Sequence, residues 1–465
     1  MTKRIIPVAL FVYNRRDTVE TLLDCLKSEG IPLLYVFSDG PKDDLDQIKV
    51  DQVREVISAI DWCEVVVFER PVNFGLGRSQ IQGISEVLSR HYAALIFEDD
   101  LFFVKGTYSY LVSALEFYEN APEVMSVTGW THPLITPKNL HGNPYFDGKS
   151  ECWGWGTWSR AWKGMERSAL EIYSECLSRG IDVEKYGSDM PKMALEAADK
   201  NLWAVRWWYL HMLNDGLCLR PPHTLIETSG FDGRGTTVNP TMAIWRNPQL
   251  TDCPSIPEHY PEPIENIDCK KLWRNAVDRT PVKYSGVYSP KGYELGTGIW
   301  QFQNFLMEVE TEYLLAMALR NGFDGARNGQ HNGRYNLAVF IRDDEMLQLL
   351  RSRLLLTLET LNVSFQKAET TETLEFYSYQ TGHFVRTHSD KPAQVGRDLY
   401  TNYKILIYLN SDFEGGSTYF DTLDLKVNPG KGGAIIFNTD LSHSGLEVLR
   451  GAKYILCLRF RSGIL

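Results

Sequence analysis

Two histidines and one aspartate near the C-terminus have the residue types and spacing of a metal site. His388 and Asp390 stand two positions apart in the segment RTHSD, and side chains at i and i+2 of an extended strand share a face. Alone, this pair is weak evidence, because two polar residues are common on a solvated strand. His443 follows after four strand-like segments, and two histidines with one carboxylate are the open coordination of non-haem Fe(II) oxygenases. The trio predicts an iron site with positions left for a bidentate co-substrate and O₂.

Two residues near this trio could bind a co-substrate carboxylate. Lys453 stands at the start of the last predicted strand, and Tyr379 precedes the first histidine and offers a hydroxyl. His383 competes as a metal ligand, but an unbroken strand would place it on the opposite face, so we expect it at the surface or behind the ligands. Arg450 and Arg459 are other available cations, at less suitable spacing.

A second group of charged residues follows buried strands in the N-terminal part. Glu98, Asp99 and Asp100 end an apolar strand, and adjacent carboxylates raise each other's pKa unless a cation offsets them. Such a strand end suits Mg²⁺ or Mn²⁺ shared with phosphate oxygens, although a solvated acidic turn is the plain alternative. Asp39 ends another strand, and Arg15 follows the first, where it could meet a pyrophosphate or form a surface salt bridge. Together these residues favour a nucleotide-sugar site.

The pattern of the first hundred residues shows how that second group could be brought together. Apolar and amphipathic segments alternate in the order β-α-β-α-β-α-β: PVALFVY, TVETLLDCLKSEG, LLYVFSDGP, DQVREVISAI, EVVVFER, GRSQIQGISEVLSRH and AALIFEDD. This order predicts a largely parallel sheet covered on both faces. Because ligands bind beyond the carboxyl ends of such strands, the clusters YNRR, FSDG and FEDD should converge on one crevice.

The rest of the chain changes character twice. Residues 121–240 are irregular and rich in tryptophan, which we assign mostly to the core, with Gly154-Trp155-Gly156 as the candidate for a substrate-facing wall. Residues 250–300 carry many prolines and glycines. Helical segments at 307–322 and 343–361 then precede closely spaced short strands with Gly/Pro turns. That pattern predicts a sandwich or jelly roll that carries the His-Asp-His trio.

Composition narrows the classes of protein. The 465 residues suggest two or three domains, and 43% hydrophobic with 23% charged residues is ordinary for a globular protein. A net charge of -11 argues against a nucleic-acid or anionic-membrane partner. The eight cysteines form no Cys-x-x-Cys pair, which argues against structural zinc and fits a reducing cytoplasm. The run IIPVALFVY lacks a cleavage site, and no run approaches the ~20 apolar residues of a membrane span.

The N-terminal segments resemble GT-A glycosyltransferases. IPVALFVYNR, SDG, NFGLGRSQIQGISEV and FEDDL follow the order of the N-acetylglucosaminyltransferase I type, and CWGWGTWSRAW and GFDG-x-GT are similar to segments of bacterial surface-glycan transferases. The resemblance implies a Rossmann-like α/β fold, a nucleotide-sugar donor of the UDP-sugar kind, and Mn²⁺ or Mg²⁺. It implies these roles: Asp39 at the uracil or ribose, Arg15 near the phosphates, Glu98 and Asp99 at the sugar or ribose, and Asp100 on the metal.

One departure from that family concerns the catalytic base. Its inverting members place the base in a Trp-flanked acidic motif, and the matching stretch here, LWAVRW at 202–207, has no carboxylate. Asp199, Asp215 and Asp232 lie near in sequence, but none matches by motif. Because an inverting transfer needs a base at the acceptor hydroxyl, we assign none. The base has moved, or the domain works by another mechanism, or it only binds.

The C-terminal segments resemble the prolyl 4-hydroxylase group of 2-oxoglutarate oxygenases. The motifs are Tyr379-x8-HSD, YKILIYLN, EGGSTYF, VNPGKGGAIIF and His443-x9-Lys453. The resemblance implies a double-stranded β-helix with supporting helices, in which His388, Asp390 and His443 hold Fe(II). It implies that Lys453 and Tyr379 anchor 2-oxoglutarate, that O₂ is co-substrate, and that ascorbate is an optional addition. A lysine anchor favours this group over collagen lysyl hydroxylases, and the resemblance does not fix proline as the target.

We therefore predict a bifunctional enzyme. Residues 1–275 form a GT-A glycosyltransferase domain, 276–300 a linker, and 301–465 an Fe(II)/2-oxoglutarate dioxygenase domain. The enzyme would glycosylate a glycan or protein acceptor and hydroxylate the same or a related substrate, in the cytoplasm. The alternative is an active hydroxylase with a non-catalytic glycosyltransferase-like binding domain. The donor sugar, the acceptor, the stereochemical outcome and the oligomeric state stay open.

Overall fold

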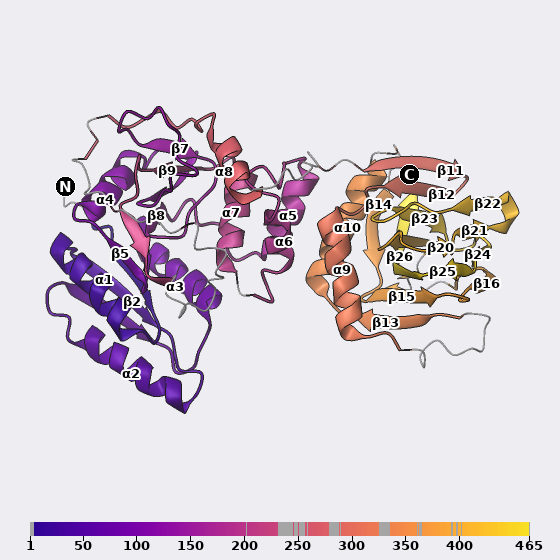
Figure 1. The fold of residues 1–465 in the computed structure, drawn as a ribbon, viewed down its shortest axis with the longest axis horizontal. Helices are drawn as coiled ribbons and strands as arrows, with labels where there is room; N and C mark the ends of the chain where they lie inside the picture. Colours follow the sequence, from indigo (N-terminus) through magenta and orange to yellow (C-terminus); the bar gives the residue numbers. More distant parts are fainter. Residues whose placement is uncertain are drawn as a thin grey trace. The chain divides into compact units, whose positions relative to one another are not determined.

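The computed structural model divides the chain into two compact units (Figure 1). The first comprises residues 1–172 and 183–284, and the second comprises residues 173–182 and 285–465. The structure describes residues 4–200, 202–230, 245, 250, 256–257, 259–278, 288, 290–324, 335–359, 361, 365–391, 394–396, 399–400 and 402–464. Asp232 and the GFDG-x-GT segment, apart from its first glycine, lie outside these residues.

The first unit is built on a mixed eight-stranded sheet of order β3-β2-β1-β4-β8-β6-β9-β7. Strands β1 to β4 pair in parallel, as the alternating sequence predicts. β8 runs antiparallel between β4 and β6, so the sheet becomes mixed beyond the first hundred residues. The strands are β1 (Val8–Val12), β2 (Leu33–Ser38), β3 (Glu64–Glu69), β4 (Ala93–Glu98), β6 (Val124–Thr128), β7 (Tyr145–Asp147), β8 (Trp155–Trp158) and β9 (Leu217–Arg220), with a separate pair β5 (Leu101–Phe103) and β10 (Ile226–Thr228).

Helices cover both faces of this sheet, because its central strands are apolar on both sides. Leu10 of β1 shares a core with Leu22 of α1, whereas Phe11 faces the other way, toward α3. Gly83 of α3 lies so close to the Phe11 ring that a Cβ there would approach to 2.5 Å. The helices are α1 (Arg16–Glu29), α2 (Asp44–Ser58), α3 (Leu76–Arg90), α4 (Thr107–Phe117), α5 (Ala169–Ser178, which spans the division between units), α6 (Met190–Leu195), α7 (Trp203–Leu213) and α8 (Cys269–Asp278).

The tryptophans of the first unit form a packed cluster. Trp155 of β8 makes ring contacts with Trp162, Trp203 and Trp207 at centroid distances of 6.0, 5.8 and 5.4 Å. Trp155 is 0% exposed, so the expectation that Gly154-Trp155-Gly156 forms a substrate-facing wall is wrong. The indole fills the space between the sheet and α7, which is the core assignment made for the other tryptophans.

The second unit is built on two antiparallel sheets that share one core, with two further strand pairs, β17-β18 and β20-β25. The main sheet has the order β11-β12-β23-β19-β26-β15-β13, with β14 also paired to β26, and the smaller sheet has the order β16-β24-β21-β22. Leu406 and Phe437 of the main sheet pack in one cluster with Phe420 and Val427 of the smaller sheet. Apolar residues on the facing sides therefore hold the two sheets together, in the jelly-roll arrangement that the sequence predicts.

Helices α9 (Glu308–Asn321) and α10 (Asp344–Glu359) lie where the two helical segments were predicted, and they contact strands of the main sheet. The first two strands of that sheet begin inside the predicted linker 276–300, so this part of the linker is strand. No helix among the described residues is long and apolar enough to cross a membrane. The strands are β11 (Lys291–Gly296), β12 (Ile299–Gln303), β13 (Leu337–Ile341), β14 (Phe365–Thr370), β15 (Leu374–Gln380), β16 (Val385–His388), β17 (Gln394–Gly396), β18 (Leu399–Tyr400), β19 (Tyr403–Tyr408), β20 (Glu414–Gly415), β21 (Thr418–Phe420), β22 (Leu425–Val427), β23 (Ala434–Asn438), β24 (His443–Gly445), β25 (Val448–Arg450) and β26 (Ala452–Ile464).

Candidate metal centre and co-substrate pocket

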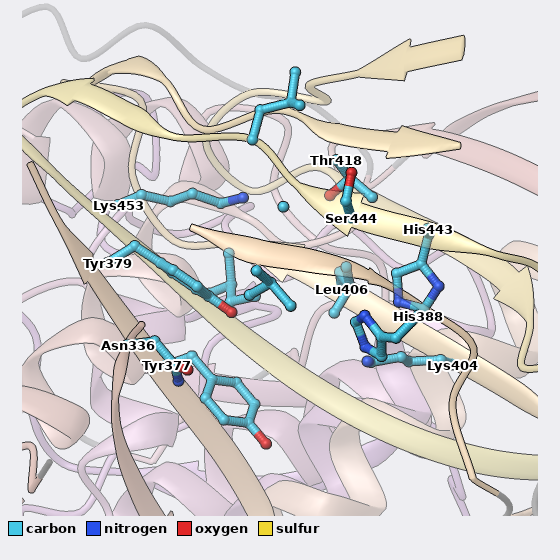
Figure 2. Close-up of a pocket in the computed structure, with 14 residues that line it drawn as sticks. Asn336, Tyr377, Tyr379, His388, Lys404, Leu406, Thr418, His443, Ser444 and Lys453 are labelled. Atoms are coloured by element: carbon cyan, nitrogen blue, oxygen red, sulfur yellow. The ribbon is translucent and has the colours of Figure 1, made fainter. Parts of the chain in front are cut away.

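The smaller sheet of the second unit brings the predicted iron ligands together. β16 and β24 pair antiparallel with His388 opposite His443, and their ring centroids are 4.5 Å apart (Figure 2). Asp390 follows β16 and its backbone N–H donates to the carbonyl of Thr439 at 3.0 Å. One ligand atom from each of the three side chains lies within 4.8 Å of the others, and no other group of this kind occurs in the described part of the chain.

Backbone carbonyls orient both imidazoles. Nδ1 of His388 lies 2.9 Å from the carbonyl oxygen of Arg386, and Nδ1 of His443 lies 2.9 Å from that of Leu441. A carbonyl accepts from a protonated Nδ1, so Nε2 carries the lone pair. The two Nε2 atoms lie 3.8 and 3.5 Å from the Asp390 carboxylate oxygens. Two imidazole lone pairs beside one carboxylate fit Fe(II).

The protonation states of the trio also suit a metal. Burial, followed by the nearby Lys404 ammonium, lowers the pKa of His443 to about 4, so its imidazole is neutral at pH 7. Burial acts to raise the pKa of Asp390, but the ammonium of Lys404 outweighs it and holds that pKa below its usual value. The site thus offers a neutral imidazole and an ionised carboxylate without prior proton loss.

A pocket extends from the two histidines into the space between the sheets (Figure 2). Tyr379 of β15 and Lys453 of β26 are direct cross-strand partners, and both line this pocket. The Lys453 ammonium donates to the carbonyl of Gly416 at 2.5 Å and to the Tyr408 hydroxyl at 3.1 Å. These two bonds hold a buried cation at the end of the pocket away from the histidines, where it could meet a carboxylate.

The competing residues lie elsewhere. His383 is not part of the His-Asp-His group and does not line the pocket. Arg450 is exposed and pairs with Glu414 at 3.3 Å. Arg459 lies 3.7 Å from Glu375 and does not line the pocket either. This geometry supports Lys453 as the co-substrate anchor.

Sequence reasoning missed other residues at this site. The pocket is also lined by Lys404 and Leu406 of β19, and by Asn336, Tyr377, Thr418, Ser444 and Ile455. The Tyr408 hydroxyl, 2.9 Å from the hydroxyl of Thr418, connects the anchor to β21. The segment YKILIYLN could have indicated three of these residues, because residues 404, 406 and 408 share one face of a strand.

The first unit gathers four of its five predicted site residues, Arg15, Glu98, Asp99 and Asp100. Arg15, between β1 and α1, pairs with Asp99 at 2.8 Å and with Asp100 at 3.2 Å, both just beyond β4. The backbone N–H of Tyr13 also donates to Asp99. The ends of β1 and β4 therefore converge as predicted, and the arginine offsets the clustered carboxylates.

Two carboxyl groups of this cluster, those of Glu98 and Asp99, still have pKa values above their usual ones. Burial, followed by repulsion from Asp100 and Asp99, raises the pKa of Glu98 well above its usual value. Burial raises the pKa of Asp99 to about 6, against the opposing effect of Arg15. Among the described residues these acids are not part of a group of three close metal-ligand side chains, and the predicted Mn²⁺ at Asp100 stays a prediction.

Asp39, by contrast, organises a loop. It is 6% exposed and its carboxylate accepts from the backbone N–H groups of Gly40, Phe74 and Gly75 at 2.9, 2.8 and 3.0 Å. These bonds tie the end of β2 to the start of α3, which accounts for its burial. A contact of Asp39 with a nucleotide stays a prediction.

Comparison with known proteins defines the class of the C-terminal part. Residues 374–461, which include all five predicted iron and 2-oxoglutarate residues, match the model of the 2OG-Fe(II) oxygenase superfamily. The C-terminal part of this chain therefore carries an oxygenase domain of the 2OG-Fe(II), prolyl 4-hydroxylase-like kind.

Particular relatives come from viruses and bacteria. A "Putative prolyl 4-hydroxylase" of Acanthamoeba polyphaga mimivirus is 31% identical over 118 residues, which are 22% of this chain and 48% of that protein, so the match spans about half the relative's length. The viral collagen prolyl hydroxylase of Paramecium Bursaria Chlorella virus-1 is 21% identical, with a TM-score of 0.31 over 36% of this chain and 98% of that one. A Pseudomonas putida prolyl-4-hydroxylase is 22% identical, with a TM-score of 0.29 over 35% of this chain and 92% of that one.

Proposed function

We propose that the second unit is an Fe(II)- and 2-oxoglutarate-dependent hydroxylase. The observation that carries this proposal is that one ligand atom each of His388, Asp390 and His443 lies within 4.8 Å of the others, beside a pocket that both histidines and Lys453 line. When bound, Fe(II) supplies the redox chemistry by which 2-oxoglutarate, O₂ and a C–H bond become succinate, CO₂ and a hydroxylated product.

In this proposal the chain binds and orients the reactants. The two Nε2 atoms and the Asp390 carboxylate would hold the metal. Lys453 pairs with the distal carboxylate of 2-oxoglutarate, and the Tyr379 hydroxyl donates to the same group. Leu406 and Ile455, which line the pocket, cover the methylene groups between the two carboxylates.

The test is 2-oxoglutarate turnover by the full chain with Fe(II). We expect succinate formation by the wild type and its loss, by a factor of at least about 100, in His388→Ala. The control is Lys431→Met, which changes an exposed lysine bound to Glu308 and Glu312 and should leave turnover unchanged. Equal turnover by wild type and His388→Ala would show that the iron site is assigned incorrectly.

We propose that the first unit binds a nucleotide-sugar and transfers its sugar. The convergence of Arg15, Asp99 and Asp100 beyond two parallel strands supports this reading, because pyrophosphate and a divalent cation need such opposite charges side by side. Asp100 would hold Mn²⁺ or Mg²⁺, and Glu98 and Asp39 would lie at the sugar and the nucleoside. We still assign no catalytic base, so a non-catalytic binding domain is the alternative.

A panel of UDP-sugars with Mn²⁺ distinguishes these two readings. Binding is followed by the thermal shift of the full chain, and transfer or hydrolysis is followed by UDP release. UDP release that disappears in Asp100→Ala supports a transferase, whereas a thermal shift without release supports the binding domain. If no UDP-sugar produces either signal, both readings of this unit are wrong.

We further propose that both units act on one glycan or protein acceptor, in the cytoplasm. The mimivirus relative is named for prolyl 4-hydroxylation, so peptides with exposed prolines are the first hydroxylation substrates to test, beside glycans. Mass spectrometry of each substrate after incubation with one set of co-substrates at a time detects hydroxyl or sugar addition. If the two activities share no acceptor, the link between them fails.

A further inference from the structure

We propose that Lys404 is a positioning residue of the iron site, which holds the Asp390 carboxylate in place beside the two imidazoles. This inference rests on the proposed iron site. Lys404 belongs to neither of the two charged groups that the sequence indicated, and it interrupts the apolar strand YKILIYLN.

The contact between the two side chains is close and buried. The Lys404 ammonium donates to both Asp390 oxygens, at 3.0 and 2.8 Å, and the two residues are each 7% exposed. Burying an unpaired ammonium group costs free energy. The ion pair with Asp390 therefore stabilises Lys404 in this buried position and keeps its ammonium against the carboxylate.

The position of Lys404 is set by the main sheet rather than by the strand that carries the ligands. Lys404 of β19 stands opposite Phe437 of β23 and Arg459 of β26, and its ammonium lies 6.0 Å from the Phe437 ring. Asp390 follows β16 of the smaller sheet. The ion pair therefore connects the two sheets at the metal site, and Lys404 lines the pocket together with His388 and His443 (Figure 2).

A carboxylate released from Lys404 could turn away from the two imidazoles, and the three side chains would then no longer offer their ligand atoms together. Partners behind metal ligands typically contribute about 10–100-fold to metal affinity or activity. Lys404 contacts the predicted ligand Asp390 as such a partner does. Its positive charge also repels a metal cation.

The test measures metal affinity and not only activity. Mn(II) is titrated into the full chain without 2-oxoglutarate and followed by electron paramagnetic resonance, and the part of the binding that His388→Ala abolishes is assigned to the site. We expect Lys404→Met to weaken that part at least about tenfold, and Lys404→Arg to restore it to within about threefold. Thermal melting of the metal-free variants shows whether they fold.

A matched control comes from the other buried lysine of the pocket. Lys453→Met should weaken 2-oxoglutarate binding and leave Mn(II) affinity unchanged, because the Lys453 ammonium donates to Tyr408 and Gly416 and not to Asp390. If Lys404→Met does not fold, Lys404→Gln is compared with Lys404→Arg, and loss of affinity in the neutral variant alone supports the proposal.

Three results would overturn it. If Lys404→Met, or the glutamine variant, binds Mn(II) as tightly as the wild type, Lys404 does not position the ligand. Tighter binding would show that charge repulsion outweighs orientation, and it would contradict the proposal equally. If the wild type binds no Mn(II) that His388→Ala removes, the iron site itself fails, which is distinguishable from the failure of Lys404 alone.

Discussion

His388 and His443 stand directly opposite each other on β16 and β24, with ring centroids 4.5 Å apart. A one-residue shift in this pairing would turn one imidazole to the other face of the sheet. The site therefore depends on register, and the Asp390 N–H bond to Thr439 fixes the chain just beyond the pair. Substitutions in the co-substrate pocket and in the packed cores can test whether the side chains have the roles that this structure gives them.

Loss of the Lys453 ammonium should weaken binding of 2-oxoglutarate. A hydrogen bond to a charged group contributes about 1.5–3 kcal/mol, so Lys453→Met should raise the KM for 2-oxoglutarate about 10–100-fold. Steady-state succinate formation measures this. Lys431→Met, at an exposed lysine, serves as the control, and an unchanged KM in Lys453→Met would mean that another group anchors the co-substrate.

Asp39 should contribute mainly to stability. Asp39→Ala leaves three backbone N–H groups without their charged acceptor, which should lower the free energy of unfolding of the first unit by about 3 kcal/mol. Urea unfolding followed by tryptophan fluorescence reports on this unit, because every tryptophan except Trp300 lies within residues 1–284. If the variant is as stable as the wild type but binds the nucleotide-sugar more weakly, Asp39 contacts the nucleotide instead.

The first unit should lose stability in mild acid because of His211. This buried histidine lies 3.0 Å from both the Ser126 hydroxyl and the Trp207 carbonyl, and burial lowers its pKa from 6.5 to about 3. Below pH 6.5 the His211 side chain therefore binds a proton in the unfolded chain but not in the folded chain. The contribution of neutral His211 to the free energy of unfolding is complete above pH 6.5, and it falls by about 2–3 kcal/mol by pH 4.5. Urea unfolding at pH 7.5 and 4.5 should show this difference, and His211→Gln should reduce it; an equal loss in both proteins would assign it to other groups.

Trp155 should act through packing and not through a ligand. Trp155→Ala removes an indole that contacts three other tryptophans, which should cost about 3–5 kcal/mol of unfolding free energy. Trp155→Phe should cost less, because it keeps most of the ring volume. A variant that unfolds like the wild type but binds UDP-sugars more weakly would return Trp155 to the substrate-facing role.

The sequence alone determined those features that depend on local periodicity. The β-α alternation of the first hundred residues predicted parallel strands, and β1 to β4 are parallel. The i, i+2 spacing of His388 and Asp390, with His443 beyond, predicted a trio that the fold brings together. Strand and helix patterns have short periods, so neighbouring residues carry most of that information.

Only the tertiary structure decided the roles that depend on distant neighbours. Trp155 lies in the core, Asp39 binds three loop amides, and Lys404 reaches Asp390 from another sheet. Each outcome depends on cross-strand register, burial and the pairing of charges removed from water, and these quantities are properties of contacts between residues far apart in the chain. The residue types of the oxygenase site could therefore be found in the sequence, whereas the partners that fix them required the fold.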